Sequence, residues 1–308
     1  MLPVITARTP HQFLTLYAPV TASSPATGEV KFLPYKYLSR PSSTKGVPRE
    51  ISLEPIKFML GFYKTAGEKK EHGIELHKGF VVTVPALGLY QTDVQYAVKQ
   101  CHLGKGTPLH LRTFALTYTY WDQVTRARKG GYKPSNQWMT VQQYADEHLG
   151  VDCNGFAGAY YQLCFPQTGL SPHSDLPESA VVKAGAGGTA VTSHPFADGG
   201  KLRTGIDQLR AGDALIYTHR HVSVLGDSEC GDIYFVNDVK VQGKTVTHTT
   251  GRFSLYQARG DKANGVQRNI YDITHTGGQD FTIQPISPKP GPPEAIKAIV
   301  RPSGVPEW

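Results

Sequence analysis

Residues 151–164 read Val-Asp-Cys-Asn-Gly-Phe-Ala-Gly-Ala-Tyr-Tyr-Gln-Leu-Cys, and this stretch predicts a helix with a cysteine at its start. Asp152 is a favourable N-cap residue, which puts Cys153 in the first helical turn. Exposed backbone N–H groups and the positive end of the helix dipole favour the thiolate there, and the thiolate is the nucleophile. The N–H groups in the region of Asp152 and Asn154 can also hold an oxyanion. Cys153 is therefore the candidate nucleophile.

The chain on either side of this helix predicts an α+β fold. Upstream, helices are expected near 92–101, over 111–128 and after Thr140, where Gln143 completes a capping-box pattern. Downstream, the pattern changes to short strands, expected at 214–217, 221–225, 233–241, 244–248, 281–286 and 295–300. These elements favour a cysteine-bearing helix packed on an antiparallel sheet.

Proline and glycine suggest how the chain is organised. Seven prolines fall within residues 1–50, a density that excludes long helices and central strands. We therefore expect residues 1–105 to form an N-terminal extension or accessory region that is partly loop-rich. Residues 106–308 are expected to form the catalytic domain. Within it, residues 165–205 are rich in Gly, Ser, Pro and Ala without clear periodicity, which predicts a loop insertion.

A nucleophilic cysteine needs a base, and His221 is the best placed of the 12 histidines. A strand over 214–217, a turn and a second strand from His221 put this side chain at a sheet end, within reach of a helix start. A third residue should orient the imidazole through its other nitrogen. If residues 225 and 233 flank a hairpin, Asn237 lies opposite His221, and a one-residue slip presents Asp238 instead. Asn237 is preferred, and Asp238 remains the alternative.

The other cysteines and histidines suggest neither a metal site nor a cofactor. Cysteines stand at 101, 153, 164 and 230, without a Cys-x-x-Cys pair or the spacing of a zinc ribbon, so free thiols are expected. Cys164 falls on an apolar helix face and is expected to belong to the core. His219 and His221 can share a strand face, but no carboxylate or cysteine stands at ligand spacing from them.

Composition restricts the partners and the location. The chain has 308 residues, a net charge of +7 and a pI of about 9.1. Its lysines and arginines are dispersed, so a nucleic-acid partner is not expected, whereas the anionic polymers of a bacterial wall would attract this charge. No apolar stretch reaches the ~18 residues that a membrane span needs. The N-terminus lacks a secretory signal pattern, so we expect synthesis in the cytoplasm and delivery to the periplasm or a target cell by a specialised route.

Three motifs resemble a known family. Residues 152–156 read Asp-Cys-Asn-Gly-Phe, residues 209–213 read Leu-Arg-Ala-Gly-Asp, and residues 221–226 read His-Val-Ser-Val-Leu-Gly. In this order they resemble the NlpC/P60 cysteine peptidases and their CHAP amidase relatives, over about residues 140–250. The resemblance implies a papain-like α+β fold, with Cys153 as nucleophile, His221 as base, and Asn237 or Asp238 as orienting residue.

The resemblance also implies a function. Members of this family hydrolyse amide bonds in the stem peptides of bacterial peptidoglycan, which is therefore the expected substrate. Such a protein would act as an antibacterial effector or a lysin, with a secretion-system component and an immunity protein as further partners. The alternatives are a deamidase, transglutaminase-like or acyltransferase toxin that acts on a protein, and an inactive binding module. Asn154, where the family usually has serine, and the absence of a Tyr-x-Trp-Gly-Gly stretch before the cysteine depart from the family pattern.

Overall fold

The computed structural model describes residues 9–17, 19–34, 36–37, 83–84, 89–128, 140–174, 176–177, 179–231, 233–259 and 265–307. The chain divides into two compact units, which we call the barrel unit and the helical unit. The barrel unit contains residues 1–15, 153–259 and 266–308, and the helical unit contains residues 16–152 and 260–265. The expected boundary between residues 105 and 106 thus falls inside the helical unit. Of the expected N-terminal extension, residues 1–8, 18, 35, 38–82 and 85–88 lie outside the described ranges.

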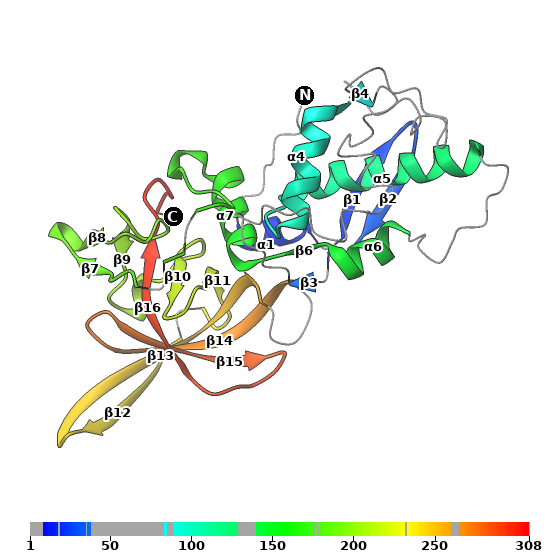
Figure 1. The fold of residues 1–308 in the computed structure, drawn as a ribbon. Coiled ribbons are helices and arrows are strands. Elements are labelled where there is room, and N and C mark those ends of the chain that lie inside the picture. The colour runs from blue at the N-terminus through cyan, green and yellow to red at the C-terminus, as the bar shows by residue number, and fades with distance from the viewer. Residues whose placement is uncertain are drawn as a thin grey trace. The chain divides into compact units, whose positions relative to one another are not determined.

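The helical unit contains the three helices predicted upstream of Cys153 (Figure 1). They are α4 (Gln91–His102), α5 (Pro108–Arg128) and α6 (Val141–His148), and α4 packs on α5. Three short strand pairs accompany them: β1 (Val20–Ser24) with β2 (Gly28–Phe32), β3 (Lys36–Tyr37) with β6 (Gly150–Val151), and β4 (Thr83–Val84) with β5 (Leu89–Tyr90). Thr140 and Gln143 form the expected capping box at the start of α6. The three helix predictions are confirmed.

The barrel unit begins with the cysteine-bearing helix, α7 (Cys153–Cys164), which is also confirmed. Phe156 and Tyr160 are buried on one side of α7, and their rings pack on Phe13 of the short helix α1 (Pro10–Leu14) at centroid distances of 5.6 and 5.5 Å. Gly158 faces the backbone at Ser171, where any Cβ would overlap with the carbonyl oxygen. The small residue therefore lets a loop, rather than a sheet, pass close to this part of the helix.

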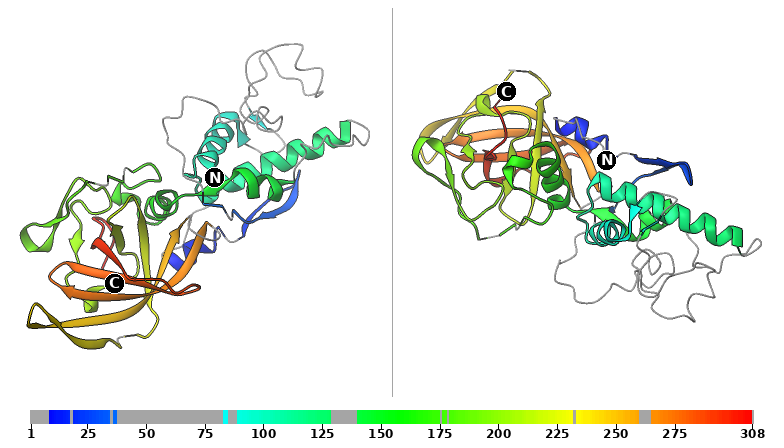
Figure 2. Two further views of the ribbon diagram at one scale, coloured as in Figure 1. Left: turned by 60° about the horizontal axis from the view of Figure 1, so that its bottom comes forward. Right: turned by 90° about the horizontal axis from the view of Figure 1, so that it is seen from above.

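A closed antiparallel barrel is the central feature of this unit (Figure 2). Its six strands follow the order β10 (Ala214–Tyr217), β11 (Val222–Ser228), β13 (Lys244–Ala258), β14 (Val266–Gly277), β15 (Asp280–Ser287) and β16 (Glu294–Arg301), and β16 pairs back with β10. Two further strands, β12 (Phe235–Val241) on β13 and β9 (Lys201–Leu202) on β16, complete an eight-stranded sheet. The expected papain-like α+β fold is therefore wrong. The fold is mostly β, because the strands after α7 close on themselves into a barrel.

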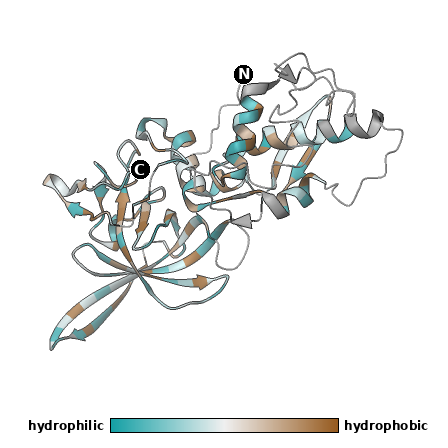
Figure 3. Cartoon of the chain, viewed as in Figure 1, coloured by the Kyte–Doolittle hydropathy of each residue, from teal (hydrophilic) through white to brown (hydrophobic). Residues whose placement is uncertain are grey.

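Hydrophobic and hydrophilic residues alternate along parts of the barrel strands (Figure 3), and buried apolar side chains form the core of the barrel. The buried cluster consists of Ile206, Leu209, Leu215, Tyr217, Leu225, Phe253, Leu255, Tyr271, Ile273, Phe281, Ile283, Ile296 and Ile299. Most of these residues come from the six barrel strands, and those on β10, β13, β14 and β15 stand two apart along the strand. The same alternation decides which polar side chains point inward at the strand ends.

The predicted strand positions are confirmed, but one predicted pairing is wrong. β11 pairs with the second half of β13, where Val224 lies opposite Tyr256, while β12 pairs with the first half of β13. β11 and β12 are therefore not the two arms of one hairpin, as the sequence suggested. A strand of 15 residues, β13, covers both of them. The sequence prediction ended this strand at residue 248 and did not include β14.

The expected loop insertion at 165–205 contains several short elements. They are the 3-10 turns η3 (Pro166–Thr168) and η4 (Ala186–Gly188), the strand pair β7 (Lys183–Ala184) and β8 (Ala190–Val191), and β9, which joins the barrel sheet. A last 3-10 turn, η5 (Ile206–Gln208), leads into β10. Across the described ranges, no helix combines the length and the apolar character that a membrane crossing requires.

Candidate active site

Cys153 is the first residue of α7, and its thiol lies beside the strand end that carries His221. The Sγ atom is 3.8 Å from the carbonyl oxygen of Arg220, the residue directly before His221. The side chains are shielded from bulk water, since Cys153 is 3% exposed and His221 is 5% exposed. The structure thus places the thiol of Cys153, the candidate nucleophile, against the residue that directly precedes His221, the candidate base.

His221 lies on the interior side of the barrel, at one end of β11. Side chains two apart on a strand share a face, so His221 and Ser223 point the same way as Leu225, which belongs to the barrel core. Ser223 is fully buried. Gln257 lies across from it on β13 and is also fully buried. Polar side chains therefore continue the apolar core toward the barrel end.

Gln257 is the residue that orients the imidazole. Its Oε1 is 2.9 Å from His221 Nε2, and it also accepts a hydrogen bond from Ser223 Oγ at 2.8 Å. Because an amide oxygen only accepts, Nε2 must carry the proton of the neutral imidazole, and Nδ1 has the lone pair. Nδ1 is then the ring nitrogen that can take the proton of the Cys153 thiol.

Two tyrosines support these polar residues. Gln257 Nε2 donates to Tyr271 Oη at 3.0 Å. Tyr217 Oη lies 2.9 Å from Ser223 Oγ, and its ring meets that of His221 edge-on at a centroid distance of 4.5 Å. Burial raises the pKa of Tyr217 far above its ordinary value, so this hydroxyl stays neutral and can both donate and accept. The imidazole is therefore held by a ring contact with Tyr217 as well as by Nε2.

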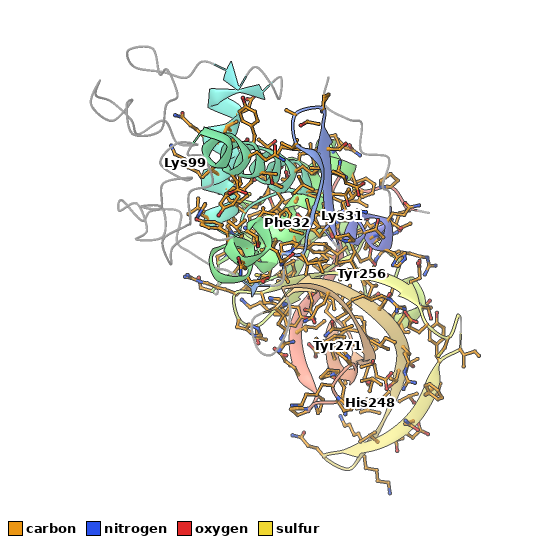
Figure 4. The ribbon with its side chains drawn as sticks, turned by 90° about the vertical axis from the view of Figure 1, so that its right-hand side faces the viewer. Lys31, Phe32, Lys99, His248, Tyr256 and Tyr271 are labelled. Carbon is orange, nitrogen blue, oxygen red and sulfur yellow. The ribbon has the colours of Figure 1, made fainter. Side chains whose placement is uncertain are left out.

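The structure does not bring Asn237 or Asp238 to His221. Both residues are exposed on β12, where Asn237 pairs with His248 of β13. Figure 4 shows His248 on the two-stranded ribbon that extends from the barrel strands. The orienting role expected for Asn237 or Asp238 is therefore wrong. Gln257 occupies that position because β13, not β12, is the strand beside β11.

Sequence reasoning missed Gln257 because the predicted strand stopped too early. The stretch 253–257 reads Phe-Ser-Leu-Tyr-Gln, in which Phe253 and Leu255 alternate with smaller or more polar neighbours. Continuing that alternation puts Gln257 on the interior face. The alternation that places Gln257 on the interior face can be seen in the sequence. Only the pairing of β13 with β11 brings this side chain to His221.

Asp152 and Asn154 flank the nucleophile in the sequence. Asp152 Oδ2 forms an ion pair with Lys105 Nζ at 2.6 Å, within the helical unit. Asn154 is 4% exposed, and its Nδ2 donates to the carbonyl oxygen of Ser174, which ties the first turn of α7 to the loop after it. Its buried Oδ1 has no hydrogen-bond partner among the residues that the structure describes. The first N–H groups of a helix have no acceptor within the helix, so this end suits an oxyanion.

Two other thiols in the chain serve as internal controls for the reactivity of Cys153. Burial raises the pKa of the Cys101 thiol well above its ordinary value and that of Cys164 to about 12, so both stay protonated at neutral pH. We expect iodoacetamide at neutral pH to alkylate Cys153 faster than either, on the order of tenfold or more. Timed quenching and peptide mass spectrometry measure the three rates, with urea-unfolded protein as the reference. Equally slow alkylation of all three would contradict a thiolate at Cys153.

His219, the neighbour considered for metal binding, pairs with a carboxylate instead. Its Nδ1 is 3.2 Å from Glu294 Oε1, and its ring stacks on that of His221 at 5.9 Å. In the part of the chain that the structure describes, no three or more His, Cys, Asp or Glu side chains are grouped to hold a metal ion.

No family model matches the chain, and neither a curated protein nor a solved structure matches it significantly.

Proposed function

We propose that this chain is a cysteine-dependent hydrolase of amide bonds, with Cys153 as nucleophile, His221 as base and Gln257 as orienting residue. The observation that carries the proposal is the Cys153 thiol at a helix start, 3.8 Å from the carbonyl oxygen of Arg220, which directly precedes His221, whose Nε2 is held by Gln257. A nucleophile next to a base that a third group orients is the arrangement that covalent acyl transfer needs.

In the proposed reaction, His221 Nδ1 takes the thiol proton and the Cys153 thiolate attacks the carbonyl carbon of the amide. The N–H groups and the dipole at the start of α7 stabilise the negative charge that develops on the carbonyl oxygen. The imidazolium then protonates the leaving amine, and a thioester remains on Cys153. Water, deprotonated by the same imidazole, hydrolyses the thioester to a carboxylic acid and restores the thiol.

Stem peptides of bacterial peptidoglycan are the substrate that we propose. The support is the resemblance of residues 152–156, 209–213 and 221–226 to the motifs of peptidoglycan-cleaving NlpC/P60 and CHAP enzymes. The net charge of +7 adds to it, because a basic protein is attracted to an anionic wall. This chemistry is consistent with the role of an antibacterial effector or of a lysin. An effector would be paired with an immunity protein.

Digestion of purified peptidoglycan tests the proposal. Wild-type protein should release peptide-bearing fragments, and their masses identify the bond that is cleaved. Cys153→Ala protein serves as the negative control. Ammonia release or acyl transfer on protein substrates, with peptidoglycan left intact, would support the deamidase or acyltransferase alternative instead. No product from either substrate, together with Cys153 as slow toward iodoacetamide as Cys164, would contradict catalysis and favour a binding module.

A further inference from the structure

The side-chain amide of Gln257 can face His221 in two ways. Its oxygen only accepts hydrogen bonds and its NH₂ group only donates, yet the two ends have nearly the same shape. With the oxygen toward His221, Nε2 carries the imidazole proton and Nδ1 can act as the base. With the amide turned over, the NH₂ group would meet Nε2, and the proton would move to Nδ1. That nitrogen could then no longer accept the proton of Cys153.

Tyr271 contacts the far end of this amide. Gln257 Nε2 donates to Tyr271 Oη at 3.0 Å, and Arg259 Nη1 donates to the same oxygen at 3.3 Å. A guanidinium only donates, so in this arrangement the phenol oxygen is the acceptor in both hydrogen bonds. Tyr271 is 2% exposed, and Figure 4 shows it among the barrel strands. A ring packed in the core cannot move away without opening a cavity, so the phenol oxygen stays in place.

Arg259 is held in turn by a carboxylate. Its Nη2 lies 3.7 Å from Glu294 Oε2, and the other oxygen of Glu294 is the partner of His219. Both members of the Arg259–Glu294 pair are about one quarter exposed, so solvent screens their attraction, and the pair positions the guanidinium more than it stabilises the fold. The contacts thus run from the protein surface inward to Gln257.

We propose that Tyr271, held by Arg259, is a positioning residue that keeps the oxygen of Gln257 toward His221. In this role Tyr271 acts through Gln257. It selects the tautomer of His221 in which Nδ1 is the base. This inference rests on the proposed function, because it assigns a role in preparing the Cys153–His221 pair.

A double-mutant cycle separates this role from a structural one. In Gln257→Glu protein both ends of the side chain are acceptors, so an oxygen faces His221 whichever way the group turns. We expect Tyr271→Phe alone to lower kcat on peptidoglycan fragments roughly tenfold, with little change in KM. In the Gln257→Glu protein, the same substitution should cost about twofold or less. Tyr256→Phe, which alters a buried tyrosine on the opposite face of β13, is the matched control and should keep wild-type kinetics.

Nitrogen-15 NMR of His221 gives a readout that does not require turnover. In Cys153→Ala protein at a pH of about 9, where an ordinary imidazole is neutral, we expect the proton on Nε2. Adding Tyr271→Phe should introduce a population with the proton on Nδ1.

Two results would overturn the inference. One is an equal loss of kcat from Tyr271→Phe in both Gln257 backgrounds, and the other is an Nδ1–H imidazole while Tyr271 is present. The second can be measured even if Tyr271→Phe protein fails to fold. Failure of the proposed function looks different, because it would appear in the wild-type protein as absent turnover and slow alkylation of Cys153.

Discussion

Replacement of Cys153 or His221 with alanine is expected to lower kcat for amide hydrolysis by a similar and large factor, on the order of 10³ or more. Neither group works without the other, because the thiol needs a base and the imidazole has no nucleophile to activate. The double variant should therefore be no slower than either single variant. Rates of fragment release from peptidoglycan, measured for all three variants at one pH, check this expectation.

His219→Ala provides the matched control for His221. The His219 ring stacks on that of His221, but it is 53% exposed and pairs with Glu294 rather than with the thiol or Gln257. We expect its loss to change kcat by about twofold or less, as for a surface group without a direct role. If His219→Ala were as inactive as His221→Ala, the assignment of the base would have to be revised. Strictly additive losses in the Cys153 and His221 double variant would also speak against a coupled pair.

Asp213→Asn is expected to cause the largest loss of stability, about 3–5 kcal/mol in the free energy of unfolding. Asp213 is fully buried and accepts hydrogen bonds from Arg203 Nε and Nη2, each at 2.9 Å, and from Arg301 Nη1 at 3.1 Å. Both arginines are 2% exposed. Removal of the carboxylate charge would take a fully buried counter-ion away from both guanidinium groups, while Arg203 would keep its ion pair with Glu307, which is 46% exposed. Urea unfolding followed by circular dichroism measures the effect.

Asp272→Asn is the comparison for this stability experiment. Asp272 forms a two-point ion pair with Arg252, at 2.7 and 3.0 Å, on side chains that are 22% and 37% exposed. An ion pair that is open to solvent contributes about 0–1 kcal/mol, so this variant should unfold close to the wild type. Similar losses in the free energy of unfolding from Asp213→Asn and Asp272→Asn would show that the burial of Asp213 and its two arginines does not increase their contribution to stability.

Local sequence signals were sufficient for the four helices within residues 91–164 and for the positions of Cys153 at a helix start and His221 at a strand end. The capping box at Thr140 and Gln143 starts α6 as expected, and Asp152-Cys153 marks the start of α7. The strand end at His221 was also indicated by the turn before it. Each of these features is encoded within a few consecutive residues, because caps, turns and periodicity act between near neighbours. The sequence could therefore indicate both Cys153 and His221 without knowledge of the sheet.

The barrel and the orienting residue were not predictable in the same way. β14 carries Arg268, Asn269 and Asp272 between its apolar residues, so its strand character is weak when it is considered alone. It forms a strand because β13 and β15 pair with its two edges. Unless residues 266–277 are recognised as a strand, the sequence does not predict a closed barrel, and the position of Tyr271 cannot be predicted either.

The sequence by itself determined that Cys153 begins a helix, that His221 lies at a strand end, and that strands follow the cysteine-bearing helix. Only the tertiary structure decided that these strands close into a barrel and that β13, rather than β12, is the neighbour of β11. That pairing selects Gln257 over Asn237 as the partner of the imidazole. The physical reason is that strand pairing depends on hydrogen bonds and core contacts between distant segments, and a helix cap depends on adjacent residues.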